Sequence, residues 1–138
     1  MDTRSINVLG YTAADSRFVV KTFNTQLQVT NTIDANDRTN PYEYLLAGFA
    51  GYVNGVGRHV AAGQGILLQS LQVEIKADTL PNGMPGFESI KIVVMPTTTA
   101  SLAALQKWLK ELQAVTTVYN SISATLPEFV LYKEYTHT

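Results

Sequence analysis

The stretch "NPYEYLLAGFAGYVNGVG", residues 40–57, decides how the rest of the chain is interpreted. Asn40 is a good helix N-cap, Pro41 suits the first helical position, and Glu43 follows the cap at the spacing of a capping box. The apolar run behind them predicts a helix that continues to about Ala62, with Gly63 as a natural terminator. We therefore expect the fold to be organised around one long helix.

This helix contains an unusual number of glycines. Gly48, Gly51 and Gly55 are spaced by three and four residues, so they lie along one face. Each costs about 1 kcal/mol relative to alanine, but small residues let another backbone come close. From Tyr44 to Val56 the helix is apolar nearly all round, which predicts burial on most sides. The glycine face is expected to meet either the sheet of its own subunit or a second subunit, and the pattern alone leaves both open.

Segments with strand character flank this helix. Three precede it, "SINVLGYTA", "RFVVKTF" and "TQLQVT", and three follow it, "LLQSLQVEIKADTL", "FESIKIVVM" and "FVLYKEY". "AADS" and "PNGMPG" are typical of the turns of hairpins. The two longest strands should form a hairpin with one solvent-exposed face, because apolar and polar residues alternate along both.

A second helix is predicted within "PTTTASLAALQKWLKELQAV", with Thr99 or Ser101 as its cap. Its apolar residues form a single stripe: Leu102, Leu105, Trp108, Leu109 and Leu112. The resulting order is β-β-β-α-β-β-α-β, so we expect an α+β fold in which the helices pack on an antiparallel or mixed sheet. The length of 138 residues fits a single domain, residues 1–138.

Composition excludes several classes of function. The net charge of −1 gives no electrostatic reason to expect a nucleic acid or an anionic membrane as partner. The chain has no cysteine, which excludes disulfides and thiolate chemistry. Its two histidines do not make a metal site, and no cofactor-binding motif is present. The longest apolar stretch is too short to span a bilayer and the N-terminus lacks a signal peptide, so a cytoplasmic protein is expected.

Three segments resemble the OsmC/Ohr family, which includes stress-response proteins. "NPYEYLLAGFAGYVNGV" resembles the family's central-helix motif, "GFESIKIVVM" its next hairpin, and "TTVYNSISATLPEFVLYKEY" its second motif. The resemblance extends from about Arg17 to Tyr135. It implies an α+β fold and an intertwined homodimer in which the central helices of two subunits pack together, which would give the glycine face its partner.

The resemblance also implies a chemistry that this chain lacks. Family members reduce peroxides with a reactive cysteine and a second, resolving cysteine. By position these fall on Tyr52 and Thr116, with Thr117 in place of a proline. A phenol and an aliphatic hydroxyl do not cycle through a sulfenic acid. We therefore expect a divergent member without thiol peroxidase activity.

The resemblance also implies counterparts in this chain for the family's glutamate and arginine, but these correspondences are less direct. The glutamate that follows Asn-Pro in the peroxidase branch corresponds to Tyr42 here, whereas Glu43 matches branches in which it comes one residue later. Glu43 has a sufficient structural explanation in the capping box, which we favour. Arg17 is the nearest candidate for the family's arginine.

A small polar pocket is expected beside the two former cysteine positions. His59 lies seven residues after Tyr52, near the same helix face, and Tyr119 and Asn120 follow Thr116. This pocket could bind a small molecule or be a relic that the Tyr52 ring fills. The expected function is that of a small-ligand-binding or structural homodimer. The alternative is a non-redox enzyme that uses Tyr52, His59 or Glu43 as acid or base at the dimer interface.

Overall fold

The computed structural model describes residues 5–31, 40–116 and 126–132. The chain divides into two compact units, an N-terminal unit of residues 1–47 and a C-terminal unit of residues 48–138. The first long helix begins in the former and continues through the latter. The order of elements is β-β-β-α-β-β-α-β, as predicted, with an additional short 3-10 turn at Pro81–Gly83.

The N-terminal unit contains a three-stranded antiparallel sheet. Its strands are β1 (Leu9–Thr12), β2 (Phe18–Lys21) and β3 (Gln26–Val29), paired in sequence order. The predicted turn at "AADS" joins β1 to β2, and Ser16 within it has a φ of 72°. Tyr44, in the second turn of the helix, donates a hydrogen bond from its hydroxyl to the Gln28 carbonyl oxygen at 3.2 Å.

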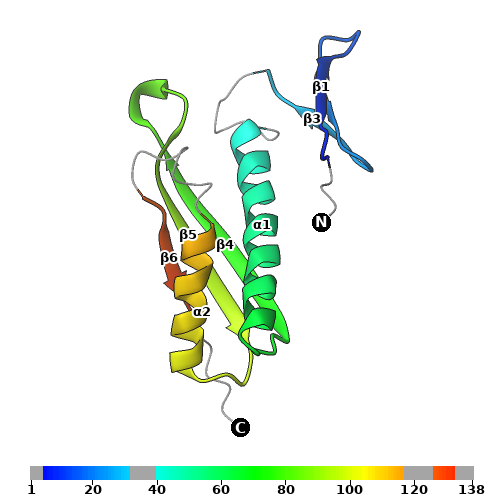
Figure 1. The fold of residues 1–138 in the computed structure, drawn as a ribbon. Coiled ribbons are helices and arrows are strands. Elements are labelled where there is room, and N and C mark those ends of the chain that lie inside the picture. The colour runs from blue at the N-terminus through cyan, green and yellow to red at the C-terminus, as the bar shows by residue number, and fades with distance from the viewer. Residues whose placement is uncertain (1–4, 32–39, 117–125, 133–138) are drawn as a thin grey trace. The chain divides into compact units, whose positions relative to one another are not determined.

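The C-terminal unit contains a mixed sheet covered by helices (Figure 1). β4 (Ser70–Thr79) pairs antiparallel with β5 (Phe87–Thr97), and β6 (Glu128–Leu131) pairs parallel with the other edge of β5. α1 (Pro41–Gly63) and α2 (Leu102–Val115) run in opposite directions, and in this unit both lie over the same face of the sheet. The strands thus form two separate sheets, where the element order had suggested one.

The core of the C-terminal unit lies between these helices and β5. Alternate residues of β5 point inward as predicted, and Ile90, Ile92 and Val94 are buried. The predicted stripe of α2 supplies three buried residues, Leu105, Trp108 and Leu112. Leu102, by contrast, is exposed at the first helical position, where the helix has not yet reached the core.

Both helices begin at a predicted N-cap. The Asn40 side-chain oxygen accepts a hydrogen bond from the Glu43 backbone N–H at 3.0 Å. Of the two candidate caps for α2, Ser101 is the one used, because its hydroxyl accepts from the Ala104 N–H at 3.1 Å. These bonds satisfy donors that every helix leaves open in its first turn.

The end of α1 is a Schellman motif. α1 ends at Gly63 as predicted, but the left-handed residue is Gly65, which has a φ of 71°. The Ile66 N–H donates to the Ala61 carbonyl oxygen and the Gly65 N–H to that of Ala62. Glycine suits Gly65 because a side chain there would be strained.

Candidate functional site

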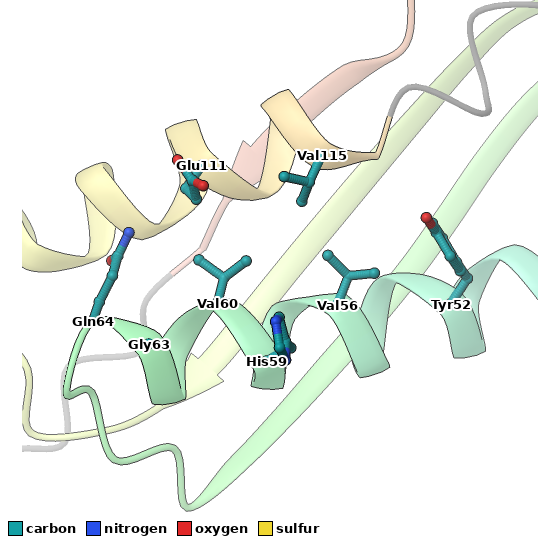
Figure 2. Close-up of a pocket in the computed structure, with 8 residues that line it drawn as sticks. All are labelled: Tyr52, Val56, His59, Val60, Gly63, Gln64, Glu111 and Val115. Carbon is teal, nitrogen blue, oxygen red and sulfur yellow. The ribbon is translucent and has the colours of Figure 1, made fainter. Parts of the chain in front are cut away.

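A pocket of about 460 Å³ lies between α1 and α2 in the C-terminal unit (Figure 2). We call it the α1–α2 pocket. It is lined by Tyr52, Val56, His59, Val60, Gly63, Gln64, Glu111 and Val115. Its volume falls within the range of about 300–1,000 Å³ that is typical of small-molecule sites.

Helical spacing brings these residues together. On α1 the lining residues follow one another about one helical turn apart, at Tyr52, at Val56, at the adjacent pair His59 and Val60, and at Gly63. They therefore form one strip along the helix. On α2, Glu111 and Val115 are one turn apart and face this strip. Because the helices run antiparallel, Val115 lies towards the Tyr52 end of the pocket and Glu111 towards the Gln64 end (Figure 2).

A close contact between the helices fixes their position beside the pocket. The Trp108 indole N–H donates a hydrogen bond to the Gly57 carbonyl oxygen at 2.8 Å, and both residues are buried. A Cβ at Gly57 would lie 3.2 Å from the Trp108 ring and 3.0 Å from the Leu71 side chain. The missing side chain at Gly57 therefore allows α2 to pack directly on the backbone of α1.

Several polar side chains of the pocket make no hydrogen bond or ion pair with the described residues. The Gln64 Oε1 atom is buried and accepts no hydrogen bond from the part of the chain that the structure describes. Within the same residues, the side chains of Tyr52, His59 and Glu111 make no hydrogen bond or ion pair. All three are exposed, Tyr52 by 45%. Such groups are available to a ligand.

Two of the residues singled out in the sequence, Tyr52 and His59, meet in this pocket. Tyr52 borders the cavity, and space remains beside its ring. Thr116 lies at the C-terminal cap of α2, 2% exposed, where its hydroxyl donates to the Leu112 carbonyl oxygen at 2.7 Å. At this end of α2 the pocket wall is the neighbouring Val115. Tyr119 and Asn120 lie outside the described residues.

The remaining candidates belong to the N-terminal unit. Tyr42 is half-buried and Glu43 exposed, both in the first turn of α1. Arg17 pairs with Asp15 at the turn between β1 and β2, and its guanidinium donates to Gln28 at 3.0 Å. The Arg17 backbone N–H and guanidinium donate to the Asp15 carboxylate, which holds the pKa of Asp15 below its usual value.

Apart from Tyr52 and His59, sequence reasoning predicted none of the lining residues, and so it missed Val56, Val60, Gly63, Gln64, Glu111 and Val115. Glu111 lies outside the apolar stripe predicted for α2, and it is exposed. The available signal was its spacing of four residues from Val115, which places both on one strip beside the apolar stripe. Which strip of α2 would face α1 depended on the packing at Gly57, and the sequence pattern does not specify that packing.

Neither a cluster of metal ligands nor a membrane-spanning helix occurs among the described residues. No group of three or more His, Cys, Asp or Glu side chains there is placed to hold a metal ion. In that same part of the chain, no helix combines the length and the hydrophobicity needed to cross a membrane.

Comparison with known proteins identifies relatives of the fold. The chain superimposes on an OsmC-like protein from Mycoplasma pneumoniae with a TM-score of 0.74 at 15% identity, covering 99% of this chain and 100% of that one. For an organic hydroperoxide resistance protein OsmC from Legionella pneumophila the TM-score is 0.65 at 17% identity, covering 98% and 100%. An OsmC-like protein of unknown function from Vibrio cholerae gives 0.65 at 14% identity, covering 97% and 100%.

Sequence comparison is more specific than these distant structural matches. No curated protein matches the chain. The family described as OsmC-like protein matches residues 34–128, well over half of the chain, including α1, β4, β5 and α2. The chain therefore belongs to the OsmC-like protein family.

Proposed function

We propose that this protein is a homodimer that binds a small molecule in the α1–α2 pocket and has no thiol peroxidase activity. The observation that carries this proposal is the pocket itself. Tyr52, at the position where the resemblance places the reactive cysteine, borders an open cavity with apolar walls and unpartnered polar groups. Pockets of this composition are the usual form of a small-molecule site.

The loss of the family's redox chemistry follows from the residue types. One structural relative is described as an organic hydroperoxide resistance protein. Peroxide reduction by a thiol needs a cysteine, and this chain has none. Thr116, at the second family position, is buried and its hydroxyl is bonded to the backbone, so it is not placed to react. The fold is retained and the site is available for another use.

A second subunit is supported by the exposed side of α1. A Cβ added at Gly48, Gly51 or Gly55 would meet no atom within 4 Å in the single chain. Leu45 is also exposed on this helix, by 43%. On a solvent-exposed helix face, glycines lower helix stability and make no compensating contact. Against a second helix, they allow the two backbones to pack closely.

The alternative function is a non-redox enzyme with Tyr52 and His59 as acid and base. Its support is that both residues line one pocket. A catalytic base is normally oriented by a third group, and among the described residues neither side chain has a hydrogen-bond partner. Hydrolysis of p-nitrophenyl acetate that is lost in His59→Asn would favour this alternative over simple binding.

The binding proposal is tested with 1-octanol, an uncharged probe that matches the apolar walls. We expect chemical-shift changes at the methyl groups of Val56, Val60 and Val115 on titration. Val115→Trp should fill the pocket and abolish them, whereas Ala114→Trp, on the adjacent exposed position, should not. In parallel, the protein should not consume cumene hydroperoxide with a dithiol reductant. Absence of saturable shifts, or robust peroxide turnover, would contradict the proposal.

A further inference from the structure

The two ends of the α1–α2 pocket differ in chemistry. At one end lie the ring of Tyr52 and the methyl groups of Val115. At the other end lie Gln64, just after α1, and Glu111 on α2. The Gln64 side chain extends towards α2 with its amide nitrogen foremost (Figure 2). Between the two ends the walls are Val56 and Val60. A ligand that fits this pocket therefore has an apolar body and a polar end.

The charge of the polar end is negative. With histidine counted neutral at pH 7, Glu111 is the only one of the described lining residues that carries a formal charge. Lys107 lies one turn before it on α2, but no lysine or arginine nitrogen of the described residues comes within 4.0 Å of its carboxylate. A lysine that precedes a glutamate by four residues is also in the less favourable order for pairing.

A second acceptor lies at the same end. Gln64 Oε1 is buried without a donor in the described part of the chain, and a buried acceptor left unpaired is costly. The amide nitrogen of Gln64 is the atom directed towards α2 (Figure 2), so a half-turn of the amide group is the movement that would present the oxygen to a donor in the pocket. A ligand group that donates several hydrogen bonds would satisfy both Gln64 and Glu111.

The terminus of α1 adds to this negative potential. The pocket reaches Gly63, the last residue of the helix, where the helix dipole is negative. The last turn of α1 contains no basic residue to offset it. Three independent features, the carboxylate, the amide oxygen and the helix end, therefore favour a cation at one place.

The rest of the pocket fits the remainder of such a ligand. Tyr52 and Gly63 are eleven residues apart, so the pocket extends roughly 16 Å along α1 at about 1.5 Å per residue. That length accommodates an extended alkyl chain or a flat ring system. The exposed Tyr52 ring at the far end offers an apolar contact to its tip.

We propose that the ligand class of the α1–α2 pocket is an organic ammonium ion with an apolar body, held with its ammonium group between Glu111 and Gln64. This inference rests on the proposed binding function and specifies its ligand. An ammonium group carries three donors, which matches the acceptors present, and an organic anion would meet only repulsion from Glu111.

The test compares three probes with the same chain and different head groups: octylammonium, 1-octanol and octanoate. Titration followed by NMR or calorimetry should give octylammonium an affinity about tenfold higher than 1-octanol, and octanoate the weakest. Glu111→Gln removes the charge and keeps the shape. It should reduce octylammonium affinity about five- to tenfold and leave 1-octanol affinity unchanged.

Glu128→Gln is the matched control, because it changes the net charge equally and Glu128 lies on β6, outside the pocket lining. It should leave the affinities for all three probes unchanged. If 1-octanol binds in the pocket but octylammonium binds no better, or Glu111→Gln has no effect, the ammonium assignment is overturned and the binding function stands. If none of the probes binds, both fail.

Discussion

At Gly57 the Trp108 ring of α2 lies so close to α1 that an added methyl group would have to displace it by a few tenths of an ångström. An added Cβ would lie 3.0 Å from the Leu71 Cδ2 atom and 3.2 Å from the Trp108 ring, tighter than ordinary van der Waals contact. Displacement of the Trp108 ring would also weaken its 2.8 Å hydrogen bond to the Gly57 carbonyl oxygen. The identity of this one residue therefore controls how α1 and α2 meet.

We expect Gly57→Ala to lower the free energy of unfolding by up to about 2 kcal/mol. Overpacking in a core costs about 1–3 kcal/mol, and the better helix propensity of alanine returns about 1 kcal/mol. Gly63→Ala is the control, because a Cβ there meets no atom within 4 Å. Urea denaturation at a fixed protein concentration measures both. The indole N–H resonance of Trp108, the chain's single tryptophan, should shift only in Gly57→Ala.

At the scale of one helix, the N-terminus of α1 depends on the side chain of Asn40. Asn40 is 2% exposed, and its side chain caps the Glu43 backbone N–H. Asn40→Ala should lower the free energy of unfolding by about 1 kcal/mol or more, since both a cap and buried contacts are lost. Glu43→Ala should cost clearly less. Thermal denaturation of both variants measures the difference, and a larger effect of Glu43→Ala would contradict the capping assignment.

The order and approximate bounds of the elements were predictable because their signals are local. Alternation along β5, the cap at Asn40 and the apolar stripe of α2 each depend on residues within a few positions of one another. The division of the strands into two sheets was not predictable, since strand pairing depends on contacts between distant segments. For the same reason the sequence placed Tyr52 and His59 near one face but could not place Glu111 opposite them.

On the scale of the whole molecule, the sequence pattern also did not predict which sides of α1 are buried. Its apolar composition predicted cover on most sides, yet its buried residues are Val53, Gly57, Val60 and Ala61, on one side. At about 100° per residue, Gly51 and Gly55 lie far round the helix from Gly57. A single chain covers only one side of α1. The glycines and apolar residues on the other side are explained if a second subunit packs against them.

The dimer can be tested at that glycine face. The wild-type protein should sediment at micromolar concentration with about twice the 15.1 kDa mass of the chain. Gly51→Leu should leave the fold of each subunit intact, because the position is exposed and a Cβ there meets no atom within 4 Å. It should nevertheless raise the dimer dissociation constant at least about tenfold, since a leucine would hold two closely packed helices apart.

Ala103→Leu is the control, a small exposed residue on α2 whose replacement by leucine should leave the dimer unchanged. Circular dichroism of each variant separates loss of association from loss of folding. A wild-type mass near 15.1 kDa would show a monomer and would contradict the proposed homodimer. A dimer that is unaffected by Gly51→Leu would instead place the interface on another surface. In either case, the glycines would still lower the stability of α1 by about 1 kcal/mol each, and close helix packing would not be the reason for their presence.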